Sequence, residues 1–95
     1  MPAVTRLTDK CTGHDSCPGV PLVTASPNVF ANGKPAGRVN DTYDSHGCVV
    51  HPSHQDHITQ GSPTTFVNGI PWGRVGDSVS IGGSVAEGSP NVFAN

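Results

Sequence analysis

Ser-Pro-Asn-Val-Phe-Ala-Asn at residues 26–32 recurs letter for letter at residues 89–95, and the variant Ser-Pro-Thr-Thr-Phe-Val-Asn fills residues 62–68. Seven identical residues in two places do not arise by chance in 95 residues, so the chain is built from a repeated unit. Each stretch is rich in β-branched or aromatic residues and starts with Ser-Pro, and the stretches at residues 26–32 and 62–68 are followed by Gly. This pattern predicts a short strand that enters a tight Asn-Gly hairpin turn. No window shows helical periodicity, so we predict an all-β fold.

The repeated unit extends beyond these seven residues. Residues 33–41 read Gly-Lys-Pro-Ala-Gly-Arg-Val-Asn-Asp, and residues 69–77 read Gly-Ile-Pro-Trp-Gly-Arg-Val-Gly-Asp. The third copy stops at Asn95, and residues 2–9, Pro-Ala-Val-Thr-Arg-Leu-Thr-Asp, supply its other half. A repeat divided in this way predicts that the first and last segments pair and close the sheet, giving a pseudo-threefold body of hairpins. The alternative is a linear solenoid, but an apolar C-terminal segment is a poor solenoid cap.

Length and composition narrow the classes of protein. We expect one domain over residues 1–95, whose 34% apolar content and five aromatic side chains leave little for a core. Small domains of this kind usually need a disulfide, a metal or a partner. The net charge is −2 with only five Lys and Arg, which argues against nucleic-acid binding. Neither a signal peptide nor a membrane-spanning segment is indicated.

The repeat aligns two of the five His residues. His14 follows Asp9 by five residues, and His46 follows Asp41 by the same interval. Equivalent positions in a threefold body converge on its axis, so we expect these imidazoles to face each other. With a third His from residues 46–57 they would form a metal site, with zinc as the favoured ion and iron also compatible with an all-His set.

The fourth ligand is left open by the repeat. In the third unit the matching positions are Ile81 and Gly82, and neither can bind a metal. The candidates for the fourth ligand are Cys48, His51, His57 and, more weakly, Cys11. Alternatively, Cys17 and Cys48 could form a disulfide, although a reducing cytoplasm would keep them as thiols.

Residues repeated in every unit are interpreted as structural. The three Arg-x-x-Asp pairs end at Asp9, Asp41 and Asp77, and a catalytic acid is not expected in three copies. The equivalent aromatic side chains are Phe30, Phe66 and Phe93. We expect most of them to lie in the core, because so few large apolar residues are available. We expect Trp72 to serve packing or docking rather than chemistry.

Several motifs together resemble the PAAR-repeat family. Pro-Ala-Gly-Arg at residues 35–38 and Pro-Trp-Gly-Arg at residues 71–74 are similar to the Pro-Ala-Ala-Arg motif of that family. The Ser-Pro-x-x-Phe-x-Asn-Gly and Arg-Val-x-Asp strings, and Arg-Leu-Thr-Asp-x-Cys-Thr-Gly-His at residues 6–14, are also typical of it. The resemblance covers essentially the whole chain. It implies a short conical, pseudo-threefold fold of β-hairpins with a metal ion near its point.

The resemblance also implies a set of metal ligands. By motif position, His14, His46 and His54 match the three His that hold zinc in the family. The Cys of the family would fall at Ile81, where this chain departs from the pattern. Cys48 is the favoured replacement as fourth ligand, with His51 or His57 as alternatives.

The function implied is that of a non-enzymatic spike tip. Such a protein caps and sharpens a trimeric β-helical spike, VgrG-like or from a phage tail, with one copy per trimer. It would be assembled in the bacterial cytoplasm at the spike tip of a type VI secretion system, or in a contractile phage virion. It would contact the target membrane transiently during piercing and delivery across the cell envelope, and any effectors would bind non-covalently. A small zinc-dependent hydrolase and a free-standing metal-binding domain are the competing hypotheses.

Overall fold

Two Asn-Gly turns form the hairpins that the repeat predicts. In the computed structural model, which describes residues 1–15, 17–48 and 52–95, Asn32 and Asn68 have φ angles of 56° and 55°. The glycines that follow them have φ angles of 76° and 75°, as a turn with two left-handed residues requires. The two antiparallel pairs are β1 (Phe30–Ala31) with β2 (Lys34–Pro35), and β3 (Phe66–Val67) with β4 (Ile70–Pro71).

Isolated bridges rather than long strands connect the rest of the molecule. The described residues contain no α-helix, and their only helical turn is the 3₁₀ segment η1 (Ser80–Gly82). This agrees with the predicted all-β character. None of the helical structure in the described residues is long and apolar enough to cross a membrane.

The three repeats make the same contacts in a cyclic order. The bridged pairs are Arg6 with Ala36, Arg38 with Trp72, and Arg74 with Val4. In each pair the Arg of one unit meets the residue two places before the Arg of the next unit. The residues just before these three Arg form a ring of backbone hydrogen bonds. The N–H of Gly37 donates to Thr5 O (3.0 Å), that of Gly73 to Gly37 O (2.9 Å), and that of Thr5 to Gly73 O (2.9 Å).

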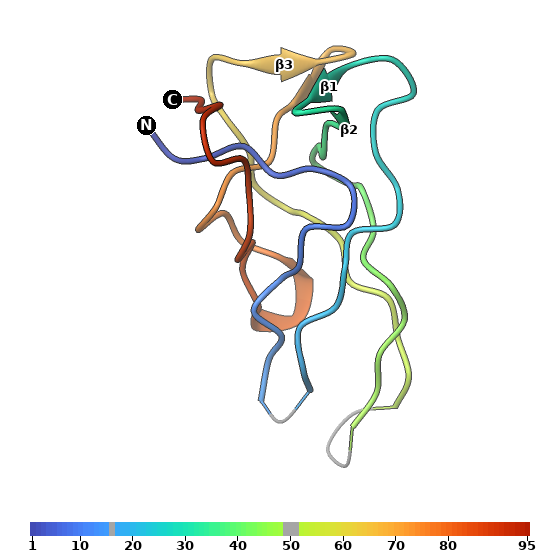
Figure 1. Ribbon diagram of the computed structural model, residues 1–95. Helices are drawn as coiled ribbons and strands as arrows, with labels where there is room; N and C mark the ends of the chain where they lie inside the picture. Colours follow the sequence, from blue (N-terminus) through green and yellow to red (C-terminus); the bar gives the residue numbers. More distant parts are fainter. Residues whose placement is uncertain (16, 49–51) are drawn as a thin grey trace.

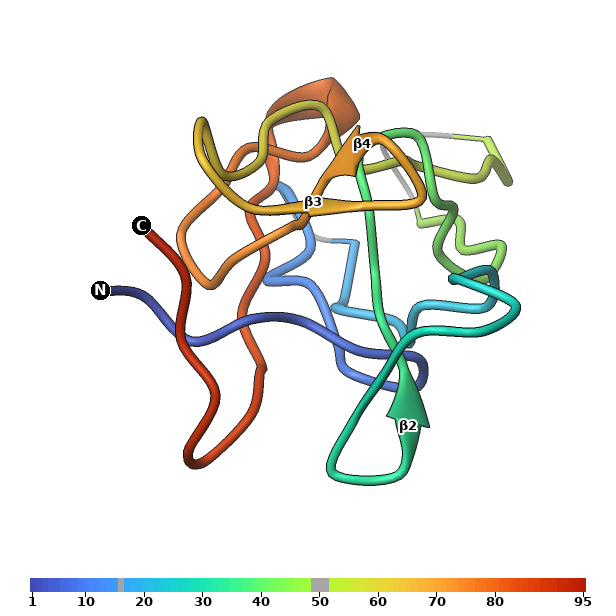
Figure 2. The ribbon, with the colours of Figure 1, turned by 90° about the horizontal axis from the view of Figure 1, so that it is seen from above.

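The first and last segments of the chain pair with each other, as the divided repeat predicts. Ala3 bridges Phe93, the N–H of Val4 donates to Val92 O (3.1 Å), and the N–H of Ala94 donates to Pro2 O (3.0 Å). Both termini lie at the same end of the molecule as the hairpins (Figure 1). Seen from above, the paired terminal segments and the two hairpins occupy different sides of the body (Figure 2). Closure therefore joins the third unit to the first.

The molecule is broad at the hairpin end and narrows to two loops at the other end (Figure 1). Its extents are 37 × 23 × 23 Å. Buried apolar residues form two clusters along this length. The first, among the hairpins and the terminal segments, consists of Val4, Ala31, Ala36, Val67, Trp72 and Ala94. The second, among the segments closer to the narrow end, consists of Cys11, Leu22, Tyr43, Ile58, Val79 and Val85.

The expectation that the equivalent Phe residues fill the core is wrong. Phe30 and Phe66 are each 55% exposed, and Phe93 is 49% exposed. The neighbouring small residues, Ala31, Val67 and Ala94, are buried instead. Successive side chains of an extended segment point to opposite faces, so burying the small residue turns the Phe outward. Small side chains suit the inner face because three units converge there. Trp72 is buried, and its indole N–H donates to Thr5 O (3.0 Å), so it serves packing.

The repeated Arg-Asp pairs hold turns, which supports their structural interpretation. In each unit the carboxylate accepts hydrogen bonds from both the backbone N–H and the guanidinium of the Arg three residues earlier, as in Arg6–Asp9. The other two pairs are Arg38–Asp41 and Arg74–Asp77. The hydrogen bonds that the Arg6 guanidinium donates to Asp9 raise the pKa of Arg6 above its ordinary value, so the guanidinium stays charged. Each pair therefore fixes the same turn.

Gly37, one of the three residues in the ring of backbone hydrogen bonds, has no room for a larger side chain. A Cβ atom there would lie 2.6 Å from Leu22 Cδ2 and 2.8 Å from Thr5 Cγ2. We expect Gly37→Ala to destabilise the fold by about 1–3 kcal/mol, as overpacking usually does. At Gly73 the nearest atoms would be 3.1 Å away, so Gly73→Ala should cost less. Thermal unfolding checks both variants, and equal melting temperatures for Gly37→Ala and the parent protein would contradict the steric argument.

Candidate metal centre

Two loops at the narrow end carry the predicted ligands (Figure 1). We call residues 13–15 and 17–18 the first apical loop, and residues 45–48 and 52–56 the second apical loop. Reciprocal backbone hydrogen bonds between His14 and Cys17 (3.1 and 2.8 Å) close the first loop. Those between His46 and His54 (3.0 and 2.8 Å) close the second. Each closing pair includes a candidate ligand, so the ligands start from fixed backbone positions.

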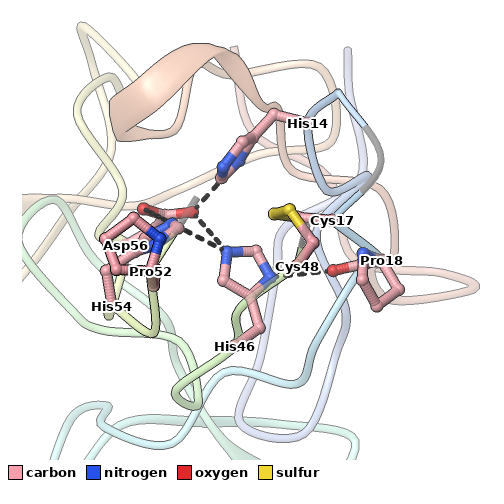
Figure 3. The surroundings of a disulfide bond; sticks show 8 residues. All are labelled: His14, Cys17, Pro18, His46, Cys48, Pro52, His54 and Asp56. Atoms are coloured by element: carbon pink, nitrogen blue, oxygen red, sulfur yellow. Dashed lines mark hydrogen bonds and ion pairs between the residues drawn. A yellow bond between two sulfur atoms is a disulfide. The ribbon is translucent and has the colours of Figure 1, made fainter. Parts of the chain in front are cut away.

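Three imidazoles and one carboxylate meet between these loops (Figure 3). His46 Nε2 lies 3.0 Å from His54 Nε2 and 3.1 Å from Asp56 Oδ2. His54 Nε2 lies 3.3 Å from Asp56 Oδ1, and His14 Nδ1 lies 3.4 Å from Asp56 Oδ2. One ligand atom from each of these four residues lies within 4.8 Å of all the others. We call these four residues the apical cluster.

The orientation of two of the rings is fixed by backbone carbonyl groups. His46 Nδ1 lies 2.9 Å from Pro18 O, and His54 Nδ1 lies 2.7 Å from Pro52 O. A carbonyl oxygen only accepts hydrogen bonds, so each Nδ1 carries a proton. In the neutral ring each Nε2 then carries a lone pair, and both lone pairs point towards the carboxylate of Asp56. Carbonyl partners of this kind are the usual outer support of metal-binding His.

A divalent cation fits this donor set. Two Nε2 lone pairs 3.0 Å apart beside a carboxylate repel one another in a buried site, and a cation at their centre removes that repulsion. Zinc bonds of about 2.0–2.1 Å in a tetrahedron place neighbouring ligand atoms about 3.3 Å apart. Four of the separations in the apical cluster, counted to either oxygen of Asp56, are 3.0–3.4 Å and close to that spacing, and all the ligand atoms lie within 4.8 Å of one another. The side chain of Asp56 is 1% exposed, and those of His14 and His46 are 4% and 3% exposed.

The structure brings some of the predicted residues together and separates others. His14 and His46, predicted from the repeat to face each other, have ring centroids 5.0 Å apart, and His54 joins them. Cys48 lies outside the apical cluster, because its sulfur is bonded to that of Cys17. The pairing of these two cysteines is the disulfide alternative considered from the sequence.

The remaining candidates are also placed away from the cluster or cannot be placed. His57 pairs through its backbone with Thr42 and is not one of the four grouped residues. Cys11 is buried in the second apolar cluster. Ile81 is 55% exposed within η1. His51 lies outside the described residues.

Asp56 was not among the ligands predicted from the sequence. The signal that could have found it is its spacing from His54. Residues two apart in an extended segment place their side chains on the same side, so a ligand at position 54 brings the side chain at position 56 with it. The carboxylate supplies a hard oxygen donor that zinc accepts together with imidazole nitrogen.

The same placement bears on the hydrolase hypothesis. That hypothesis needs an open metal position and a separate general base. Asp56, an acid next to His57 in the sequence, is itself part of the apical cluster and contacts His14, His46 and His54. The described residues form no pocket beside it. The four residues of the apical cluster could hold a metal ion among them.

Fold and site together define a small β protein with cyclic repeats and, at its narrow end, a cluster of residues that could hold a metal ion. A model of the family described as the PAAR motif matches residues 50–95. The chain belongs to the PAAR motif family. A comparison with curated proteins gave no match.

Proposed function

We propose that this chain is a non-enzymatic tip protein that caps a trimeric β-helical spike, with a structural metal at the apex of a conical, pseudo-threefold domain spanning residues 1–95. Membership of the PAAR motif family supports this role. The observation that carries it is the placement of three equivalent exposed Phe side chains on the three units whose hairpins and paired termini form the broad end.

Symmetry makes the broad end suitable for a trimer. The three units repeat the same bridges in cyclic order, so a single chain presents three similar faces. A trimeric spike presents three identical chains around its axis. One copy of this chain can therefore contact all three spike chains in the same way, whereas two copies would compete for one end.

Exposed apolar side chains supply the attraction. Phe30, Phe66 and Phe93 are each about half exposed, and each keeps the same relation to a buried small neighbour. Burying apolar surface contributes about 25 cal/mol per Å². Large aromatic side chains in a partner's pocket are frequent hot spots of protein interfaces. Edge strands of the short hairpins can add backbone hydrogen bonds to a strand of the spike.

The metal is assigned to the apex because apolar packing does not reach it. Neither apolar cluster includes a described residue of residues 12–19 or 44–57. A bound ion would join His14 of the first apical loop to His46, His54 and Asp56 of the second, and its binding energy would become folding energy. Zinc is the favoured ion, and iron is compatible with three His and one carboxylate. A rigid narrow point would concentrate force on the target membrane.

The setting of this function is a contractile injection machine. We propose assembly in the bacterial cytoplasm at the tip of a type VI spike, or in a phage-like tail, followed by delivery across the envelope of the target cell. A VgrG-like protein or a phage tail spike is the proposed partner. Effectors, where carried, would bind non-covalently to the tip complex.

The mass of the complex tests this proposal. The chain is mixed with the C-terminal β-helix of a trimeric spike from the same genome, and the product is measured by size exclusion with light scattering. We expect one copy of this chain per trimer. A spike trimer that elutes alone at every mixing ratio would contradict the proposal.

A further inference from the structure

The disulfide and the apical cluster join the same two loops. Cys17 belongs to the first apical loop and Cys48 to the second, and they are 31 residues apart in the sequence. His14 of the first loop meets His46 of the second in the apical cluster. Two chemically different crosslinks therefore bridge one gap.

Little else joins the two loops. Among the described residues, no backbone–backbone hydrogen bond crosses from residues 13–18 to residues 45–56. Neither apolar cluster has a described member in these ranges. A contact that does cross is the hydrogen bond from the ring of His46 to Pro18 O (2.9 Å). The separation of the loops is therefore controlled mainly by the disulfide and by the cluster.

We propose that the Cys17–Cys48 disulfide is a redox-controlled crosslink that sets how tightly the apex holds its metal. This inference rests on the metal site of the proposed function. Cys17 follows His14 by three residues, and Cys48 follows His46 by two. Bonding the two sulfurs fixes the two loop backbones next to their ligands, so that the ligands are close together before the ion binds. The disulfide has then already ordered the two loops, so the binding free energy of the ion is not reduced by the entropic cost of ordering them.

The chemical step is a thiol–disulfide exchange. A disulfide oxidant, such as oxidised glutathione or a thiol–disulfide oxidoreductase, accepts two electrons and two protons from the two thiols and becomes two thiols itself. The Cys17 Sγ–Cys48 Sγ bond forms as the S–S bond of the oxidant breaks. Cys17 is buried, whereas Cys48 is partly exposed, so Cys48 is the sulfur that an external thiol or disulfide can reach.

Coupling between the two crosslinks runs in both directions. If the disulfide raises metal affinity by some factor, bound metal favours the disulfide over the dithiol by the same factor. The apex would thus hold its metal more tightly in an oxidising compartment than in a reducing one. A sulfur in a disulfide is not a thiolate, so in the oxidised form Cys48 is not available as a ligand.

Competition for Zn²⁺ against a colour-forming chelator tests this inference. Affinity and release rate are measured for the full chain in the oxidised form and after reduction by a phosphine that does not bind zinc. We expect the oxidised form to bind Zn²⁺ about tenfold or more tightly, within the 5- to 150-fold range usual for coupled sites. Release of the ion to the chelator should be slower by a similar factor.

Two variants separate the disulfide from other effects of reduction. The double variant Cys17→Ser with Cys48→Ser should match the reduced protein and show no response to the reductant. The matched control Cys11→Ala removes the third thiol, which lies in the second apolar cluster, and should keep the full response.

Other outcomes would overturn the inference. Equal Zn²⁺ affinity in the two redox states would show that the disulfide does not organise the ligands. Tighter binding by the reduced form, lost in the double variant, would instead make Cys48 a thiolate ligand. This experiment does not measure spike binding. A negative result would therefore contradict the redox inference without contradicting the proposed complex of one copy per spike trimer.

Discussion

His14→Ala is expected to lower the melting temperature by roughly 10–20 °C and to release the metal. His14 brings the first apical loop into the apical cluster, so its loss leaves ligands from the second loop alone. With free metal at about 100 times its Kd, binding stabilises the folded state by about 2.7 kcal/mol. In a domain of 60–100 residues each kcal/mol corresponds to about 4–8 °C. Thermal unfolding and metal analysis of the purified variant measure the two effects.

His57→Ala is the matched control for that variant. It removes the same type of side chain from the residue next to Asp56 in the sequence, but His57 is not one of the four residues of the cluster. It should keep its metal and most of its melting temperature. Asp56→Cys offers a further check, because a thiolate is also a good zinc ligand and should retain the ion. If His14→Ala kept both its metal and its melting temperature, the apical metal site would be refuted.

Replacing all three exposed Phe by Ala is expected to weaken binding to the spike severely. Truncating each ring should weaken binding by about tenfold, which corresponds to about 1.4 kcal/mol, and by about 1,000-fold together if the sites are independent. Because the three Phe are equivalent, the single variants should weaken binding to similar extents. Isothermal titration calorimetry of each variant with a spike β-helix measures these affinities.

The fold provides a control for the Phe variants. Their side chains are about half exposed, whereas Val67 beside one of them is 1% exposed. The triple variant should therefore melt near the temperature of the parent protein, while Val67→Ala should lower that temperature. Undiminished binding by a folded triple variant would remove the Phe side chains from the docking surface.

The repeat made most of the architecture predictable. Asn-Gly at positions 32–33 and 68–69 indicated both hairpins, because these residues tolerate the left-handed backbone that a two-residue turn needs. The divided third copy predicted the pairing that is found between Ala3 and Phe93. The equal distance of His14 and His46 from their repeated Asp residues predicted that the two rings would face each other. All three predictions depend on positions in the repeat and need no knowledge of packing.

The orientation of the Phe side chains was not predictable from hydrophobicity alone. Either Phe30 or its neighbour Ala31 could face inward, and the shortage of large apolar residues favoured the Phe. The structure buries Ala31, because an extended segment can turn only one of two neighbours inward and three units share a narrow interior. The crowding on that inner side arises only when all three units are assembled.

The ligand set was predictable only in part for a related reason. The second apical loop is longer than the first apical loop of the neighbouring unit, so the repeat could not position Cys48 or Asp56. Both lie two residues from a His on the same segment, which makes them similar candidates in the sequence. Their roles differ because the first apical loop places Cys17 next to Cys48, and the two sulfurs form a disulfide. Local sequence spacing does not reveal a partner that comes from a segment 31 residues away.

The most direct test of the account is the electron cryo-microscopy structure of the chain bound to a trimeric spike. The account predicts one copy per trimer, seated by its broad end. The β1–β2 hairpin, the β3–β4 hairpin and the paired terminal segments would each rest on a different spike chain. The apical cluster would point away from the spike, with density for an ion among its four ligands. A complex in which the apical loops face the spike and the three Phe remain in solvent would contradict the account.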